Sequence, residues 1–255
     1  MSVRKVHARL AAVLITASLV ASGCASKPAV GRYSDDQKAA KFNAELATNY
    51  LAADELEEAH TKVLRALEQD PTNALANNTY AKVLVALEKP VAAEKAFAKS
   101  IRLDPDRAEY RNNFGIFLCD QGKTNQAIKQ FVKASENKFY RTPEYALDNA
   151  GVCAMAAGQL AVADKHFRSA IRQSSVFSPA ILHMAELKLK TGDASLADAY
   201  YSRFLSLARQ TPQSLYVGIN IRRQLGDKPS ANRFAEQLVK AYPRSSQART
   251  LTASE

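Results

Sequence analysis

Few residues of this chain have side chains that could carry out covalent chemistry. Its 255 residues include three cysteines, Cys24, Cys119 and Cys153, and four histidines. A cysteine nucleophile needs a histidine base close by, and neither Cys119 nor Cys153 has one near it in the sequence. H-x-x-x-H, H-E-x-x-H, G-x-S-x-G, P-loop and C-x-x-C motifs are absent from the sequence. We therefore expect no enzyme, no metal and no cofactor.

Cys24 follows a segment with the features of a secretory signal. Residues 1–9 carry three basic residues and no acidic one, and an uncharged apolar run follows over residues 10–20. This run is about half as long as the ~20 residues that a membrane-spanning helix needs. We therefore expect residues 1–23 to be removed rather than to remain as a membrane span.

The residues that end this segment, Ala21-Ser22-Gly23-Cys24, resemble a bacterial lipobox. Small residues let the backbone lie in the peptidase cleft, and only a thiol accepts diacylglycerol as a thioether. The resemblance implies that Cys24 is the acylated first residue of the mature protein, anchored by two or three chains. Ala25 after the cysteine implies sorting to the outer membrane. The alternative is a cleaved signal with a chance cysteine.

The composition is that of a folded and basic protein. Hydrophobic residues make up 47% of the chain, and it has only nine glycines and nine prolines, which argues against disorder. The net charge is +10, and seven basic against three acidic residues fall in residues 222–255. This basic end could contact anionic lipid or an acidic partner, or it could be an ordinary solvated face. No basic stripe is interleaved with aromatic residues, so nucleic acid is not expected.

A 34-residue period runs through the chain and predicts an all-α repeat protein. Pro71 and Pro105 are 34 residues apart, as are Ala59 and Ala93. Small residues at fixed places in such a period resemble the tetratricopeptide repeat, in which each unit is a pair of antiparallel helices. The resemblance implies a right-handed superhelix of about six units, the last of which is irregular and caps the array.

In each unit the two helices should come closest at a small residue of the first helix. These small residues are Ala47, Ala81, Gly115, Gly151 and Ala185. The second helix carries an alanine and, four residues later, a larger side chain, in the pairs Ala59 with Val63, Ala93 with Phe97, Ala127 with Phe131, Ala163 with Phe167, and Ala197 with Tyr201. Glycines five residues before this alanine mark the turns between helices from unit three onward. We expect the aromatic side chains to fill the core rather than to bind a ligand.

Cys119 and Cys153 form an even pair in an oxidising compartment once Cys24 is acylated. They fall in the first helices of units three and four, which stack side by side in this architecture. A disulfide requires Cα atoms within about 7 Å, so we predict a bridge if the two sites face each other, worth roughly 3–4 kcal/mol. The alternative is two buried reduced thiols.

The chain thus divides into four parts. We predict a lipoprotein signal over residues 1–23, a lipidated N-terminus and flexible tether over 24–38, the repeat domain over 39–243, and a C-terminal tail over 244–255.

Three passages resemble one family of lipid-anchored repeat proteins, the PilF/PilW pilotins of type IV pili. They are NNFGIFLCDQGKTNQAIKQF at 112–131, YRTPEYALDNAGVCAMAAGQ at 140–159, and GINIRRQLGDKPSANRFAEQLVKAYP at 218–243. The family has cysteines at the same two positions of the first two passages. The resemblance implies an outer-membrane lipoprotein, facing the periplasm, that binds the pilus secretin and promotes its outer-membrane localisation and multimer assembly. It implies no small-molecule substrate.

A partner-binding groove is predicted on the concave surface, from first-helix residues that do not pack on the second helix. In units one to three these are Thr48, Leu51, Asn78, Lys82, Val85, Asn112 and Ile116. Their polar side chains could hold carbonyl or carboxylate groups of a partner, and their apolar ones its apolar side chains.

Two other functions are compatible with these sequence features. One is a different lipid-anchored repeat scaffold, such as a β-barrel assembly component or an adaptor for cell-wall hydrolases, which would differ in the protein it captures. The other is a cell-wall enzyme with a hidden site, which would turn over peptidoglycan fragments.

Overall fold

The computed structural model describes residues 34–253, so the predicted signal, Cys24 and most of the predicted tether lie outside the described residues. Within that range the chain forms thirteen α-helices and no strand. The core clusters of these residues lie between Ala44 and Leu251, and residues 35–255 form a compact unit of their own. None of the described helices is long and apolar enough to cross a membrane.

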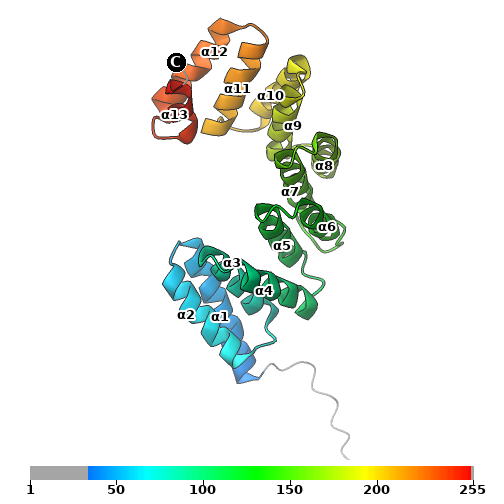
Figure 1. Ribbon diagram of the computed structural model, residues 1–255, viewed down its shortest axis with the longest axis vertical. Helices are drawn as coiled ribbons and strands as arrows, with labels where there is room; N and C mark the ends of the chain where they lie inside the picture. The colour runs from blue at the N-terminus through cyan, green and yellow to red at the C-terminus, as the bar shows by residue number, and fades with distance from the viewer. Residues whose placement is uncertain (1–33, 254–255) are drawn as a thin grey trace, which may run out of the picture. The chain divides into compact units, whose positions relative to one another are not determined.

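Twelve of the helices form six antiparallel pairs, and the all-α repeat superhelix predicted from the sequence is confirmed (Figure 1). We call the odd-numbered members of the pairs first helices and the even-numbered members second helices. In chain order the helices are α1 Asp35–Ala52, α2 Leu56–Gln69, α3 Ala74–Ala86, α4 Pro90–Leu103, α5 Ala108–Asp120, α6 Thr124–Ser135, α7 Pro143–Ala156, α8 Leu160–Gln173, α9 Ser178–Lys190, α10 Ala194–Leu207, α11 Pro212–Gln224, α12 Lys228–Ala241 and α13 Ser246–Thr252.

The helices of a pair meet where the sequence places its smallest residues. A Cβ atom added to Gly115 would lie 2.6 Å from the ring of Phe131, and one added to Gly151 would lie 2.4 Å from the ring of Phe167. Both rings are almost fully buried. Each ring therefore rests directly on the backbone of the first helix, and even a methyl group would separate the two helices.

The last unit reverses this size pattern. Counted back from the turn glycine Gly226, as in the preceding units, Ile219 stands at the position of the small residue, and Ala235 stands at that of the ring. Both side chains belong to the same cluster, with Ile219 fully buried. Gly218 faces the preceding unit instead, where an added Cβ would lie 2.5 Å from the hydroxyl oxygen of Tyr201. Exchanging large and small residues between the helices keeps the pair packed.

The two predicted boundaries of the repeat domain need correction. Helix α1 begins at Asp35, four residues before the predicted start at 39. The predicted tail contains α13, whose Ala248 and Leu251 are buried against Leu215 of α11 and Leu238 of α12. This helix covers apolar surface that the last unit would otherwise expose, so the domain extends to residue 252.

The turn inside each pair places one residue at positive φ. In the third to sixth units this residue is a glycine, namely Gly122, Gly158, Gly192 and Gly226. In the first two units the same position holds Asp54 and Glu88, with φ of 64° and 56°. Their backbones adopt this conformation at a cost of roughly 1–2 kcal/mol. The spacing to the following alanine, rather than the glycine itself, therefore marks the turn.

Replacing Gly151 by alanine tests the close approach of α7 and α8. Glycine to alanine inside a helix normally stabilises by up to about 1 kcal/mol. Here the new methyl group must displace the Phe167 ring, so we expect the free energy of unfolding to fall by roughly 1–3 kcal/mol. Urea denaturation measures the change. In a Phe167→Leu background the same substitution should cost less, and a more stable Gly151→Ala protein would contradict the packing.

Candidate partner-binding groove

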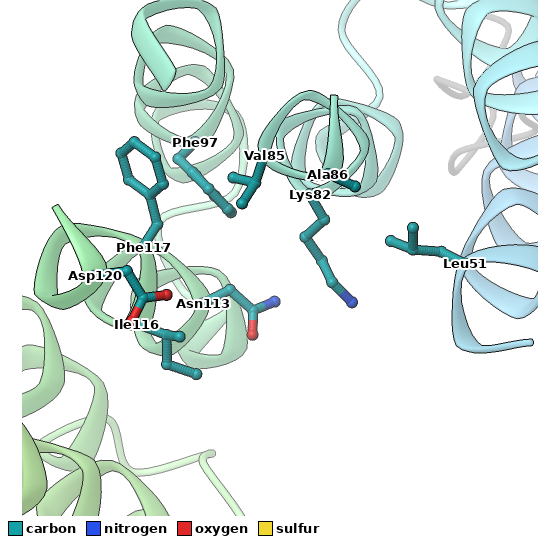
Figure 2. A pocket seen from close by; sticks show the side chains of 9 residues that line it. All are labelled: Leu51, Lys82, Val85, Ala86, Phe97, Asn113, Ile116, Phe117 and Asp120. Carbon is teal, nitrogen blue, oxygen red and sulfur yellow. The ribbon is translucent and has the colours of Figure 1, made fainter. Parts of the chain in front are cut away.

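A pocket of about 330 Å³ opens between the first helices α3 and α5 (Figure 2). We call it the α3–α5 groove. It is lined by Leu51, Lys82, Val85, Ala86, Phe97, Asn113, Ile116, Phe117 and Asp120. These residues come from α1, α3, α4 and α5, so three successive units contribute to one site.

The groove has an aromatic floor and an apolar rim. Phe97 of α4 and Phe117 of α5 are almost fully buried, and their ring centroids are 5.4 Å apart. Val85 and Ile116 also line the groove, with 39% and 42% of their surfaces exposed. Apolar surface of this kind is stabilised when another apolar group covers it. The groove is therefore suited to receive an apolar side chain.

Three polar side chains surround this apolar surface. Lys82 lies on the α3 side, whereas Asn113 and Asp120 lie on the α5 side (Figure 2). A cation and a carboxylate thus stand on opposite sides of the groove, and an amide lies on the α5 side. Such groups can orient a bound polypeptide through its charges and its backbone amides.

The groove opens because bulky rings separate α3 from α5. Thr48 of α1 and Thr79 of α3 are small enough for their hydroxyl oxygens to lie 2.9 Å apart, and these two helices pack closely. At the next interface the rings of Phe97, Phe114 and Phe117 stack between α4 and α5, with centroids 5.4–6.3 Å apart. Their volume keeps α5 away from α3, and the uncovered space is the groove.

Four of the seven predicted groove residues, Leu51, Lys82, Val85 and Ile116, line this groove. The other three, Thr48, Asn78 and Asn112, do not line it. Instead, they belong to a ladder of side-chain hydrogen bonds that connects successive first helices.

Each rung of this ladder joins one first helix to the next, and the last rung reaches α13. The bonds join Thr48 to Thr79, Asn78 to Asn113, Asn112 to Asn149, Asp148 to His183, Glu186 to Gln213, and Gln213 to Gln247, over 2.7–3.3 Å. The neutral hydrogen bonds among them contribute about 1 kcal/mol each. Their main effect is to hold the units in one register.

Sequence reasoning missed several lining residues that helical spacing could have found. Phe117 and Asp120 follow Asn113 by four and seven residues on α5. This spacing places all three on the helix face that also carries Ile116. Ala86 follows Lys82 by four residues on α3. Phe97 was expected in the core, and it is buried there while also forming part of the floor.

The structure joins Cys119 of α5 and Cys153 of α7 in the predicted disulfide, with Cα atoms 5.8 Å apart. Cys119 directly precedes Asp120 of the groove rim. The bridge therefore fixes the end of the helix that forms one side of the groove.

Removing this bridge should destabilise the domain. We expect Cys119→Ala combined with Cys153→Ala to lower the free energy of unfolding by roughly 2–4 kcal/mol, because the unfolded chain gains freedom. Urea denaturation measures this loss relative to the oxidised parent protein. The parent protein treated with reductant is the matched comparison and should lose a similar amount. Two reactive thiols at these positions in denatured, unreduced protein would show that the bridge does not form.

One rung of the ladder joins two ionisable side chains. His183 Nδ1 lies 2.9 Å from the Asp148 carboxylate, which is itself buried. Burial disfavours the charged form of His183, but the hydrogen bond and the negative charge of Asp148 outweigh it, and the pKa of His183 is raised. Glu186 adds to this effect.

The raised pKa makes part of the stability depend on pH. A histidine whose pKa is higher in the folded than in the unfolded protein contributes its full stabilisation below the unfolded pKa, which is about 6.5. This contribution is lost as the pH rises through the pKa of the folded protein. We expect the urea midpoint to fall as the pH rises from about 6 to about 8. His183→Gln should remove this component and His60→Gln should retain it. An equal pH dependence in the His183→Gln protein would count against this rung as its source.

Among the described residues, no group of three histidine, cysteine, aspartate or glutamate side chains is placed to hold a metal ion. The groove contains no nucleophile beside a base. Six helix pairs with small-against-large packing, and a groove on the first helices, define a tetratricopeptide-repeat protein suited to binding a polypeptide.

No protein-family model matches the chain. Its sequence is 28% identical to the type IV pilus assembly protein PilF of Pseudomonas aeruginosa over 199 residues, 78% of this chain and 79% of PilF. A solved structure of Pseudomonas aeruginosa PilF is similar, with a TM-score of 0.72 and 26% identity, and the match covers 87% of this chain and all of that one. The crystal structure of PilW, a widely conserved type IV pilus biogenesis factor, has a TM-score of 0.74 and 27% identity, covering 84% of this chain and 98% of PilW.

The tetratricopeptide-repeat protein YrrB shares the fold, with a TM-score of 0.52 and 14% identity over 75% of this chain and 97% of YrrB. The chain is therefore homologous to PilF, and its fold is that of PilF and PilW, tetratricopeptide-repeat proteins of type IV pilus biogenesis.

Proposed function

We propose that this protein is a pilotin: an outer-membrane lipoprotein that binds the type IV pilus secretin and promotes its localisation and multimer assembly. The homology to PilF and PilW supports a role in pilus biogenesis. The lipobox-like sequence before Cys24 supports a lipid anchor on the periplasmic face of the outer membrane. The protein acts by binding and performs no chemistry.

The α3–α5 groove is the observation that carries this proposal. Its floor, formed by Phe97 and Phe117, offers no polar group, so it provides nothing to orient a small polar substrate. Its rim offers two opposite charges and an amide at separate points. A polypeptide segment satisfies all of these at once, with an apolar side chain over the rings and a carboxylate near Lys82. We infer that the secretin supplies such a segment.

A single charge at the groove rim should abolish capture. We expect Val85→Asp to reduce the amount of secretin recovered with the tagged protein from detergent-solubilised outer membrane at least about tenfold, because it places a carboxylate on the apolar surface to be covered. Val239→Asp on α12 is the matched control, since both valines are 39% exposed. Secretin multimers separated from monomers on a gel provide the second readout.

Equal recovery with Val85→Asp and Val239→Asp would exclude this groove as the capture site. Recovery of a β-barrel assembly channel or a cell-wall hydrolase in place of the secretin would overturn the pilotin role and favour another scaffold. Normal circular dichroism of both variants ensures that the comparison reports binding rather than folding.

A further inference from the structure

Three second helices expose a lysine at the same repeat position. Lys95 of α4, Lys129 of α6 and Lys165 of α8 each lie two residues after the alanine of their unit, and all three are exposed. In Figure 1, α6 and α8 lie on the same side of the first helices α5 and α7. We call these three residues the lysine column.

The charge of the lysine column is not compensated by its own helices. The only acidic residue of α4, Glu94, is 2.7 Å from Lys123, and the only one of α8, Asp164, is paired with Arg168 and Lys188. Helix α6 has no acidic residue. None of the ion pairs found among residues 34–253 includes a member of the column. The positive charge therefore faces solvent.

An exposed aromatic residue lies among three further basic side chains beyond α6, and it borders a recess whose lining includes Asp104, Asp106 and Glu109. Lys133 at the end of the helix and Lys138 and Arg141 in the following loop are all exposed. Between them Phe139 is 85% exposed. The next residue, Tyr140, points inward and packs on the cluster that joins units three and four.

The loop is held in the conformation that presents this ring. The side-chain amide of Asn137 donates to the carbonyl oxygen of Asp106 over 2.6 Å, and its oxygen accepts from the backbone N–H of Phe139 over 2.8 Å. With Tyr140 partly buried and the Asn137 side chain hydrogen-bonded to the loop before α5, Phe139 faces outward. Its exposure is a consequence of the local structure.

We propose that the lysine column, Lys133, Lys138, Arg141 and Phe139 form a surface that lies on anionic lipid. Lysine and arginine near a negatively charged bilayer attract it, and an aromatic side chain favours the depth of the lipid headgroups. An acidic protein partner is less suited to the lysine column, because its charges are spaced along three separate helices. The groove residues Lys82, Val85 and Ile116 lie on first helices and stay open to a partner.

This membrane contact lies beyond the proposed function and does not depend on which polypeptide fills the groove. An acyl anchor and a basic surface together hold a protein on a bilayer more firmly than either alone. The contact would also set the orientation of the repeats, with the second helices toward the lipid and the first helices toward the periplasm.

Vesicle sedimentation tests the surface without the anchor. Residues 24–255 carrying Cys24→Ser contain the whole described folding unit. We expect this protein to bind vesicles of phosphatidylethanolamine with about 30% phosphatidylglycerol, and not vesicles of phosphatidylethanolamine alone. Lys95→Glu, Lys129→Glu and Lys165→Glu together should lower the partition coefficient at least about tenfold.

The matched control changes the same charge on first helices. It is the triple variant Lys41→Glu, Lys190→Glu and Arg223→Glu, which changes exposed residues of α1, α9 and α11. We expect this control to bind within about twofold of the parent. Equal loss in both triple variants, or no preference of the parent for the anionic vesicles, would overturn the proposal. Secretin capture in detergent by the column variant should be unchanged, which separates this contact from the pilotin role.

A fluorescent reporter tests the position of Phe139. The chain contains no tryptophan, so Phe139→Trp introduces a single one. We expect its emission to shift to shorter wavelength when the anionic vesicles are added. Phe42→Trp is the control, because Phe42 of α1 is an aromatic residue with 61% exposure on a first helix. No shift at residue 139, or equal shifts at both positions, would contradict the proposed orientation.

Discussion

The helix pairs depend on the contact between an aromatic ring of the second helix and the backbone of the first helix. Phe131 covers Gly115 and Phe167 covers Gly151 so closely that a Cβ atom would overlap the ring. This contact sets the distance and crossing point of the two helices in a pair, and it excludes water from both. The last unit meets the same requirement with the sizes exchanged, since Ile219 stands where the glycine would be and Ala235 where the ring would be. Because size complementarity is the constraint, either helix can supply the large partner.

Stacking of successive pairs uses different interactions. Polar side chains connect the first helices one after another, from Thr48 in α1 to Gln247 in α13. The disulfide between Cys119 and Cys153 adds one covalent link between α5 and α7. These contacts are directional, so they hold the units in register without requiring the helices to be equally close everywhere. Phe97, Phe114 and Phe117 can therefore separate α3 from α5, and the groove opens there.

The two faces of the array differ in chemistry. The first helices carry the groove, where apolar rim residues surround an aromatic floor. The second helices α4, α8 and α10 each have a single acidic side chain, and it forms an ion pair with a neighbouring unit, as Glu94 does with Lys123 and Asp198 with Arg222. Lysines at the adjacent positions are left without partners among the described residues. The same ion pairs that join the units thus leave an excess of basic side chains on α4, α6 and α8.

The sequence by itself determined the helix pairs, because their period, small residues and turn spacing are local patterns that recur every 34 residues or so. It also indicated the disulfide, since both cysteines fall on first helices of adjacent units. Only the tertiary structure decided which first-helix side chains remain available to a partner. Asn78 and Asn112 share a helix face with groove residues, but they bond to Asn113 and Asn149 of the next helices. Such pairing depends on the distance between units, which the bulk of buried rings sets and which no single repeat encodes.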